Sequence, residues 1–493
     1  MRVHRCALAS RRSAVTSSPV CIVGAGPAGL AVARALAERG IEYTHLERHT
    51  GVGGVWDIDN PGGPMYESAH LISSRTTSGY SGYPMPTSYP DYPRHDHVLA
   101  YLRAFAAHYG LDQRVETGVC VESVERDGSA WVVTRTDGTS SRHGAVVVST
   151  GSQWHPRLPA LPGTYDGEVR HSQTFRSPRE FAGQRVLVVG GGNSGCDIAC
   201  DAARNADYAA ISMRRGYWFI PKHVFGVPSD VVGGKGSFLP KPVERAAIQP
   251  LLRLLVGDTE RLGLQKPDHK LFETHPIVNS LLLHHLQHGD IVARPGIADT
   301  AGRTVTFIDG TSEEFDVVVL ATGYEHRVPV AQDLFGNAQH PDLYLNFASR
   351  EHTGLFGVGY IETNSGAFTL YDQQAHLIAA YLDGRAHRTP QAARFAAMIR
   401  TDRPDLSAGL TFDSSPRHTG YVDSDGYTRY LRRVSRMLGW PLTSPAAGAA
   451  ASSGCGGRFG RGDAGPTARE AAEVGSPSAV VAAGSAAVRT AAR

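Results

Sequence analysis

The chain is poor in cysteine, carries little excess charge and has no long apolar run. Its 493 residues include only six cysteines, whose spacing matches neither a metal motif nor a disulfide framework, which is typical of a reducing compartment. The formal net charge is +2 and no Lys/Arg block dominates, so the charge pattern does not indicate a nucleic-acid partner. No run approaches the roughly 20 apolar residues that span a bilayer. We therefore expect a cytoplasmic protein with no membrane segment and no nucleic-acid partner.

Metal and redox chemistry by side chains also find little support. Cys196 and Cys200 are four residues apart and would share one helix face, where we interpret them as small core residues rather than a redox pair. Five histidines gather between residues 269 and 288, but their spacing matches no zinc motif and carboxylate partners are sparse. The sequence therefore predicts no metal site, and predicts surface or capping roles for His269, His275, His284, His285 and His288.

The two ends of the chain differ in composition from the rest. Residues 1–18 hold several arginines and serines and no acid, which resembles a transit peptide, but they lack an apolar face, so we expect a disordered extension. Residues 444–493 are almost entirely Ala, Gly, Ser, Arg and Glu, and we expect a disordered low-complexity tail because they cannot bury a core. The residues between are too many for one simple core, and roughly two to three domains are expected.

The strongest local signal is a glycine-rich turn that follows a short apolar run. Residues 20–23 predict a buried strand, and Gly24, Gly26 and Gly29 fit the Gly-x-Gly-x-x-Gly pattern of a dinucleotide-binding turn. The first glycine permits the tight turn, the second lets the backbone approach a pyrophosphate, and the third lets helix and strand pack closely. Glu47 ends the next strand about 20 residues later, where an acid would bind ribose hydroxyls. The helix N-terminus would then face the phosphates.

A second turn of the same kind begins a second unit. Residues 185–189 predict a strand, and the glycine turn at 190–195 leads into a helix that ends near Asn205. The strand that follows ends in Arg214 and Arg215 instead of an acid. Because a carboxylate suits a free 2′-hydroxyl whereas arginine suits a 2′-phosphate, we interpret the first site as FAD-type and the second as NADP-type. A solvated basic strand end is the alternative.

The repeat extends beyond the glycine turns. Residues 145–148 and 317–320 are apolar runs that predict buried strands, and they end in the similar turns 149–151 and 321–323. Two copies of one order of elements indicate duplicated nucleotide-binding modules. Other expected elements are a hairpin of residues 115–124 and 130–136, and helices at residues 96–108, 251–264, 277–287 and 370–382.

We therefore predict an α/β fold with two Rossmann-like dinucleotide-binding domains of the three-layer type. The FAD-binding domain is expected to be discontinuous, with residues 19–160 and 325–440. The NADP-binding domain, residues 161–324, is expected to be inserted in it.

Taken together, the motifs resemble the flavin-containing monooxygenases that oxygenate amines and sulfides, over about residues 19–440. The most telling motif is residues 165–175, which resembles the family's F-x-G-x-x-x-H-x-x-x-(Y/F) with Tyr165 for the first phenylalanine. Related Baeyer–Villiger enzymes end this motif in tryptophan, whereas here it ends in Phe175. The other carrying motifs are the two glycine turns, Gly53-Gly54-Val55-Trp56, Tyr83-Pro84-Met85-Pro86, Arg214-Arg215-Gly216, Pro221-Lys222 and Ala321-Thr322-Gly323-Tyr324.

The resemblance implies a flavoprotein monooxygenase similar to N,N-dimethylaniline monooxygenases, with FAD and NADP(H) as cofactors. NADPH would reduce FAD, and a flavin C4a-hydroperoxide would transfer one oxygen atom of O2 to a small-molecule substrate, a tertiary amine or thioether. A Baeyer–Villiger-type ketone monooxygenase, an uncoupled NADPH oxidase and a non-enzymatic flavoprotein stay open. A disulfide reductase is disfavoured because the chain has no C-x-x-C or C-x-x-x-x-C. The oligomeric state stays open, a homodimer included.

One loop departs from the family pattern. Many members carry an asparagine beside the flavin where this chain has Ile72-Ser73-Ser74, so the resemblance implies that Ser73 or Ser74 supplies the donor that retains the oxygenated flavin. No side chain other than these two is expected to take part in catalysis, and His171 of the telling motif has no role that the sequence assigns. The residues expected to bind the cofactors are Gly24, Gly26, Pro27, Ala28, Gly29, Glu47, Arg48, Gly54, Val55, Trp56, Val119, Thr150, Gly151, Gly190, Gly192, Asn193, Ser194, Gly195, Arg214, Arg215, Thr322 and Gly323.

Overall fold

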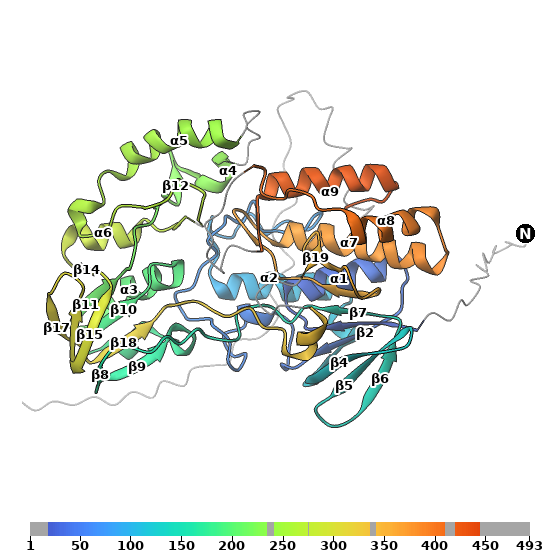
Figure 1. Cartoon of the computed structure of the whole chain (residues 1–493), viewed down its shortest axis with the longest axis horizontal. Coiled ribbons are helices and arrows are strands. Elements are labelled where there is room, and N and C mark those ends of the chain that lie inside the picture. The colour runs from blue at the N-terminus through green and yellow to red at the C-terminus, as the bar shows by residue number, and fades with distance from the viewer. Residues whose placement is uncertain (1–17, 234–240, 275, 336–341, 410–419, 444–493) are drawn as a thin grey trace, which may run out of the picture. The chain divides into compact units, whose positions relative to one another are not determined.

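A computed structural model describes residues 18–233, 241–274, 276–335, 342–409 and 420–443 (Figure 1). The expected extension, apart from Ser18, lies outside the described residues, as do the expected tail at 444–493 and His275.

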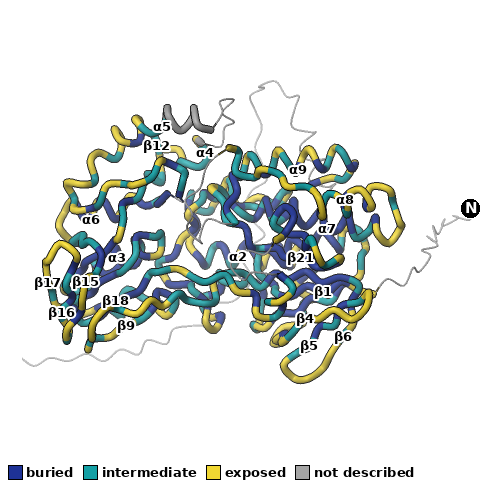
Figure 2. Tube along the Cα trace, viewed as in Figure 1, coloured by how far each residue is buried: buried dark blue, intermediate teal, exposed yellow. Residues whose placement is uncertain are grey.

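The first module is built on a seven-stranded sheet with strand order β19-β20-β21-β7-β1-β2-β3. The strands from β21 to β3 are parallel, and β19 and β20 are antiparallel additions at one edge. Every residue of β1 and β7 is buried (Figure 2), as expected of apolar runs in a parallel sheet covered on both faces. The strands are β1 (Val20–Val23), β2 (Tyr43–Glu47), β3 (Val115–Thr117), β7 (Ala145–Val148), β19 (Leu343–Tyr344), β20 (Ala348–Ser349) and β21 (Leu355–Gly357).

Three layers form because alternate residues of β1 point to opposite faces. Val20 and Ile22 pack in the same core as α1 and α7, whereas Cys21 and Val23 share a core with Trp131 of a three-stranded antiparallel sheet. That sheet consists of β4 (Val121–Asp127), β5 (Ala130–Arg135) and β6 (Ser140–His143). The helices of this module are α1 (Pro27–Glu38), α2 (His95–His108), α7 (Phe368–Ala386), α8 (Pro390–Thr401) and α9 (Ser424–Leu438).

The second module repeats this plan on a five-stranded parallel sheet with strand order β14-β11-β10-β18-β9. One face packs against α3 and α6, and the other against an antiparallel sheet of β15, β16 and β17, which β8 joins in parallel. The elements are β8 (Thr164–Tyr165), β9 (Glu168–His171), β10 (Arg185–Val189), α3 (Asn193–Asn205), β11 (Tyr208–Ser212), α4 (Ser229–Gly233), α5 (Lys241–Val256), α6 (Leu281–His288), β14 (Val292–Arg294), β15 (Ile297–Gly302), β16 (Thr304–Phe307), β17 (Ser312–Glu314) and β18 (Val317–Leu320).

The predicted fold class is confirmed. The chain builds most of the first sheet, passes through the whole of the second, and returns to add β19, β20 and β21 to the first, so the second module is inserted in the first. The residue boundaries assigned to the two domains stay predictions.

Three expected elements differ from the structure. Residues 115–124 are two strands rather than one, because the chain bends at Gly118, whose φ is +72°, and β3 extends the first sheet while only β4 forms the hairpin with β5. The helix expected at 251–264 ends at Val256. The helix expected at 277–287 begins at Leu281, because Ile277 pairs with Phe219 in an isolated β-bridge.

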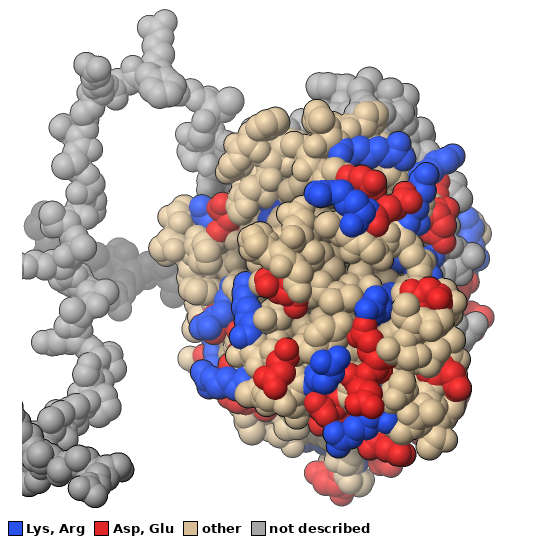
Figure 3. Space-filling view, turned by 90° about the vertical axis from the view of Figure 1, so that its left-hand side faces the viewer, with Lys and Arg blue, Asp and Glu red and all other residues tan. Residues whose placement is uncertain are grey.

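The interpretation of Cys196 and Cys200 as core residues is confirmed. Both are buried in α3 within the apolar core of the second module, and burial raises the pKa of both thiols. Within the described residues, no helix combines the length and apolarity needed to cross a membrane, and no three His, Cys, Asp or Glu side chains gather as metal ligands would. On the face shown in Figure 3, cationic and anionic side chains are interspersed.

Candidate nucleotide and flavin site

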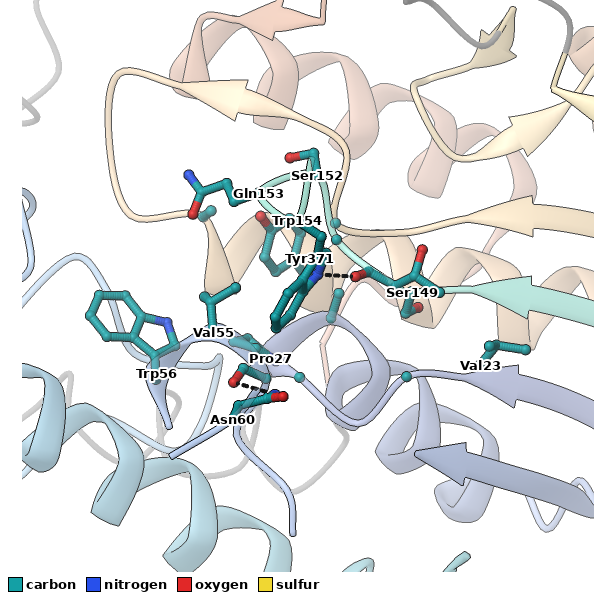
Figure 4. A pocket seen from close by; sticks show the side chains of 18 of the residues that line it. Val23, Pro27, Val55, Trp56, Asn60, Ser149, Ser152, Gln153, Trp154 and Tyr371 are labelled. Carbon is teal, nitrogen blue, oxygen red and sulfur yellow. Dashed lines mark hydrogen bonds between the residues drawn. The ribbon is translucent and has the colours of Figure 1, made fainter. Parts of the chain in front are cut away.

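A cavity of about 640 Å³ opens at the carboxyl end of β1 (Figure 4). Ligands bind at this end of the strands in open α/β sheets. Its wall includes thirteen of the residues expected to bind cofactor or to act in catalysis, namely Gly24, Gly26, Pro27, Ala28, Glu47, Arg48, Gly54, Val55, Trp56, Ser73, Val119, Thr150 and Gly151. The sequence therefore locates about a third of the residues that line the cavity.

The two glycine turns have the same geometry. Gly24 has φ of +101° and Gly190 has φ of +120°, and a Cβ on either would lie 2.6 Å or 2.4 Å from a carbonyl oxygen at the end of the neighbouring strand. Gly29 and Gly195 pack so closely on these turns that a Cβ would come within 1.9 Å and 2.0 Å of a backbone oxygen. The turns can therefore form only with glycine at these positions.

The N-terminus of α1 is suited to a pyrophosphate. The helix begins at Pro27 with Gly26 as its N-cap, no side chain caps it, and its first turn contains no acid. Its first N–H groups are therefore available to an anion that approaches Gly26. The same description holds for α3, which begins at Asn193 with Gly192 as an uncapped N-cap. Both helix starts fit the phosphates of a dinucleotide.

Glu47 is held at the end of β2 by backbone donors. Its carboxylate accepts hydrogen bonds from the N–H of Ala25 at 2.6 Å and of His49 at 2.8 Å while it lines the cavity. Nearby, burial lowers the pKa of His45 to about 4, so this imidazole is neutral and its Nε2–H donates to the Gly24 carbonyl at 3.0 Å. The acid expected to bind ribose and the glycine turn are thus both held by hydrogen bonds within the protein.

Asn60 is a cavity residue that the sequence does not single out. It is 2% exposed, and its Nδ2 donates to the Gly54 carbonyl at 3.0 Å. Its Oδ1 is buried and has no hydrogen-bond partner among the described residues. An acceptor without a partner in a buried wall is costly unless a ligand supplies a donor, and a ring N–H of the flavin fits this requirement.

Trp154 is a second cavity residue that local patterns miss. Its indole Nε1 donates to the Thr150 carbonyl at 2.6 Å (Figure 4), and the Arg48 guanidinium lies 4.0 Å from the centre of its ring. Thr150 and Arg48 belong to the residues predicted to bind cofactor, whereas Trp154, in the loop that follows β7, does not. Only its aromatic character in that loop could have drawn attention to it.

The loop at residues 71–75 contributes Leu71, Ile72 and Ser73 to the cavity wall. The Ser73 hydroxyl lies 2.8 Å from the Ser78 hydroxyl, so it already has a partner within the wall. Ser74 is fully buried and does not line the cavity. Of the two serines proposed to replace the family's asparagine, only Ser73 is therefore placed to face a flavin.

The residues expected to bind NADP(H) lie together outside this cavity. Arg214 is exposed just after β11, and Arg215 places its guanidinium 5.7 Å from the ring centre of Tyr217. The Tyr217 ring in turn closes over Gly191, where a Cβ would come within 2.7 Å of it. The Tyr217 ring, with the Arg215 cation beside it, thus lies against the second glycine turn, which fits a 2′-phosphorylated dinucleotide.

Four residues of the predicted set serve the protein's own hydrogen bonds. The Asn193 Oδ1 accepts from the Val278 N–H at 3.2 Å, and the Thr322 hydroxyl donates to the Arg157 carbonyl at 2.5 Å. The Thr150 hydroxyl pairs with that of Tyr360 at 2.9 Å, and the Gly323 carbonyl accepts from His171. These residues hold the two nucleotide turns in shape.

His171 now has a structural role. Its Nε2–H donates to the Gly323 carbonyl at 3.0 Å, and its Nδ1 accepts from the Gln173 N–H at 3.1 Å. Burial lowers the pKa of this imidazole, which favours the neutral form that this pair of hydrogen bonds requires. The Gln173 side chain donates to the carbonyls of Gly62 and Trp154, so the motif ties the second module to the cavity wall of the first.

Two glycine turns of the dinucleotide-binding type, one followed by an acid and one by arginines, are the arrangement of a flavoprotein that uses a nicotinamide cofactor. The chain belongs to the flavin-binding monooxygenase-like family, whose model matches residues 17–438. The predicted family is thereby confirmed, and with it FAD and NADP(H) as the cofactors.

Known proteins similar to this chain differ in what their names say they oxygenate. Indole-3-pyruvate monooxygenase YUCCA1 of Oryza sativa subsp. japonica is 31% identical over 69% of this chain and 86% of its own length. Dimethylaniline monooxygenase [N-oxide-forming] 2 of Macaca mulatta is 28% identical over 85% of this chain and 82% of its own. The crystal structure of cyclohexanone monooxygenase from Rhodococcus sp. Phi1 bound to NADP+ shares the fold, with a TM-score of 0.65 and 18% identity over 86% of this chain and 98% of its own.

Proposed function

We propose that this chain is an FAD- and NADPH-dependent monooxygenase that inserts one oxygen atom of O2 into a soft nucleophile, a tertiary amine or a thioether. The observation that carries the proposal is the composition of the cavity end beyond the glycine turn. Leu71, Ile72, Phe368 and Tyr371 make that end apolar and aromatic, as a small neutral organic substrate requires. Bound FAD, once reduced by NADPH, supplies the activation of O2.

The protein's own part is to bind, orient and keep the site dry. The start of α1 would bind the pyrophosphate, Glu47 the ribose, and the Asn60 Oδ1 would accept a hydrogen bond from the flavin ring. Phe368 is only 6% exposed and adds a buried apolar surface to this end of the cavity.

Tyr371 and Ser73, two described hydroxyl side chains of the cavity wall, are not activated as bases. Burial, together with the charge of Glu362, raises the pKa of the Tyr371 hydroxyl, so it stays protonated at neutral pH. The Ser73 hydroxyl pairs with Ser78 and not with a histidine. This supports chemistry centred on the flavin, because a nucleophile or base on the protein would need such an activating partner.

The test is a substrate panel under 18O2 with purified, FAD-loaded protein and NADPH. The panel contains N,N-dimethylaniline, an alkyl thioether, a cyclic ketone and indole-3-pyruvate. We expect an N-oxide or S-oxide that carries one 18O atom, with one NADPH consumed per product, and no labelled product under 16O2. A labelled ester from the ketone would instead identify a Baeyer–Villiger-type enzyme. Peroxide equal to the NADPH consumed with every substrate would identify an uncoupled oxidase.

A further inference from the structure

Residues 66–78, here called the flavin-side loop, belong to the first module and supply part of the cavity wall. Leu71, Ile72, Ser73 and Ser78 of this loop line the cavity. The loop is anchored to carboxylates of the second module at three points along its length. Its position therefore depends on the module that carries the NADP-type turn.

The three anchors are aspartates from two helices. On α3, Asp197 accepts from the Tyr66 hydroxyl at 3.2 Å, and Asp201 accepts from the Ser68 hydroxyl. On α4, Asp230 accepts from the Ser74 N–H at 2.7 Å and from the Thr77 hydroxyl at 2.6 Å. Each anchor is a hydrogen bond to a charged acceptor, which is stronger than a bond between neutral groups.

Asp197 is the anchor closest to the predicted NADP(H) contacts. It lies three residues after Ser194, about one turn further along α3, so both side chains share one helix face. The Ser194 side chain also lies within reach of the Tyr66 hydroxyl, and the second oxygen of Asp197 accepts from the Asn279 Nδ2 at 2.8 Å. Tyr66 is 6% exposed, so its hydroxyl has little access to water and depends on Asp197 and Ser194.

A pyrophosphate at the start of α3 would compete with Tyr66 for the Ser194 hydroxyl, which has one proton to donate. Tyr66 would then keep only its bond to Asp197. We propose that Asp197 is a positioning residue that holds Tyr66, and through it the flavin-side loop, in place while NADP(H) occupies the second glycine turn. This inference rests on the proposed function, since it requires NADPH to reduce a flavin in the cavity.

The loss of Asp197 should lower the rate of flavin reduction once NADPH is bound, and should leave the binding of FAD and NADPH largely unchanged. Asp197→Asn keeps the size of the side chain but loses the charge and one of two acceptor oxygens. Tyr66→Phe removes only the hydroxyl. We expect each variant to slow anaerobic flavin reduction at saturating NADPH about tenfold, with FAD content and the NADPH KM within about twofold of wild type.

The experiment is stopped-flow bleaching of the flavin by NADPH, which needs no organic substrate, on wild type, both single variants and the double variant. Because both changes break one hydrogen bond, the double variant should be no slower than the slower single variant. Asp316→Asn is the control, because Asp316 accepts from Arg185 and Arg303 elsewhere in the second module and should leave the bleaching rate unchanged.

Additive slowing in the double variant, a rise in KM alone, or a wild-type rate in Asp197→Asn would each overturn the inference. If Asp197→Asn fails to retain FAD, Tyr66→Phe alone decides, and a wild-type bleaching rate in it overturns the inference. No bleaching of the wild type would contradict the proposed function instead.

Discussion

Removal of Arg214 should lower the use of NADPH and leave the use of NADH unchanged. Arg214 is exposed after β11, and its side-chain stem lies 3.5 Å from where a Cβ of Gly296 would be. A hydrogen bond between charged groups contributes about 1.5–3 kcal/mol, and exposure to water favours the lower end of that range. A loss of about 1.4 kcal/mol corresponds to about a tenfold lower kcat/KM. We expect that factor for NADPH in Arg214→Ala.

Arg215 should matter less. Its charge is shared with Asp268, whose pKa is lowered first by a hydrogen bond from His269 and further by Arg215. The same guanidinium lies 5.7 Å from the Tyr217 ring centre. A 2′-phosphate therefore gains less from Arg215 than from Arg214, and we expect about a threefold loss in Arg215→Ala.

The assay is steady-state kinetics with NADPH and with NADH for wild type, both variants and Arg303→Ala. Arg303 is an exposed cation paired with Asp316 and tests the effect of net charge alone. The loss in Arg214→Ala should shrink as salt rises, because exposed charges are screened. An equal rise of KM for NADPH and NADH would refute the assignment of the 2′-phosphate to this strand end.

Three further outcomes follow from buried contacts. Gly24→Ala should lower the free energy of unfolding by about 3 kcal/mol and release FAD, because its Cβ would lie 2.6 Å from a carbonyl oxygen. The control is Gly128→Asn, since Gly128 has φ of +59° and open space around it. This change should alter the free energy of unfolding by less than about 0.5 kcal/mol. His45 stays neutral to about pH 4 when folded but protonates near 6.5 when unfolded, so stability falls as pH drops through that window. Chemical denaturation at pH 7.5 and pH 4 should show wild type losing about 3 kcal/mol more than His45→Gln, and equal losses would exclude this cause. Asn60→Ala should raise the Kd of FAD about tenfold and increase the peroxide formed per NADPH, as ultrafiltration and a peroxide assay would show; unchanged FAD retention would contradict its flavin contact.

Local sequence patterns predict the parts of the site that a single turn of chain creates. Gly24, Gly29 and Glu47 need only a strand, a turn and a helix in order, and the duplicated pattern at 190–195 repeats them with the same backbone geometry. The similar strands at 145–148 and 317–320 complete the pattern of two duplicated modules. The fold class and about a third of the residues that line the cavity therefore follow from the sequence.

The rest of the site depends on contacts between residues far apart in the chain. Tyr66 meets Asp197 across 131 residues, and Asn60 acquires its role only because the wall around it is buried. Helix α6 begins at Leu281 rather than at residue 277 because Ile277 pairs with Phe219, and the spacing of apolar residues does not predict this pairing. These features follow from tertiary contacts within and between the modules, for which single-sequence patterns carry no signal.

The two hydrogen bonds of His171 also limit its chemistry. An imidazole that donates from Nε2 and accepts at Nδ1 has no free nitrogen with which to take or give a proton during turnover. A substitution that can mimic only one of these bonds would loosen the Gln173 contacts to Gly62 and Trp154 instead of altering an acid or a base. The histidine of the family motif thus connects the two modules, and its loss would make the position of one nucleotide site relative to the other less well fixed.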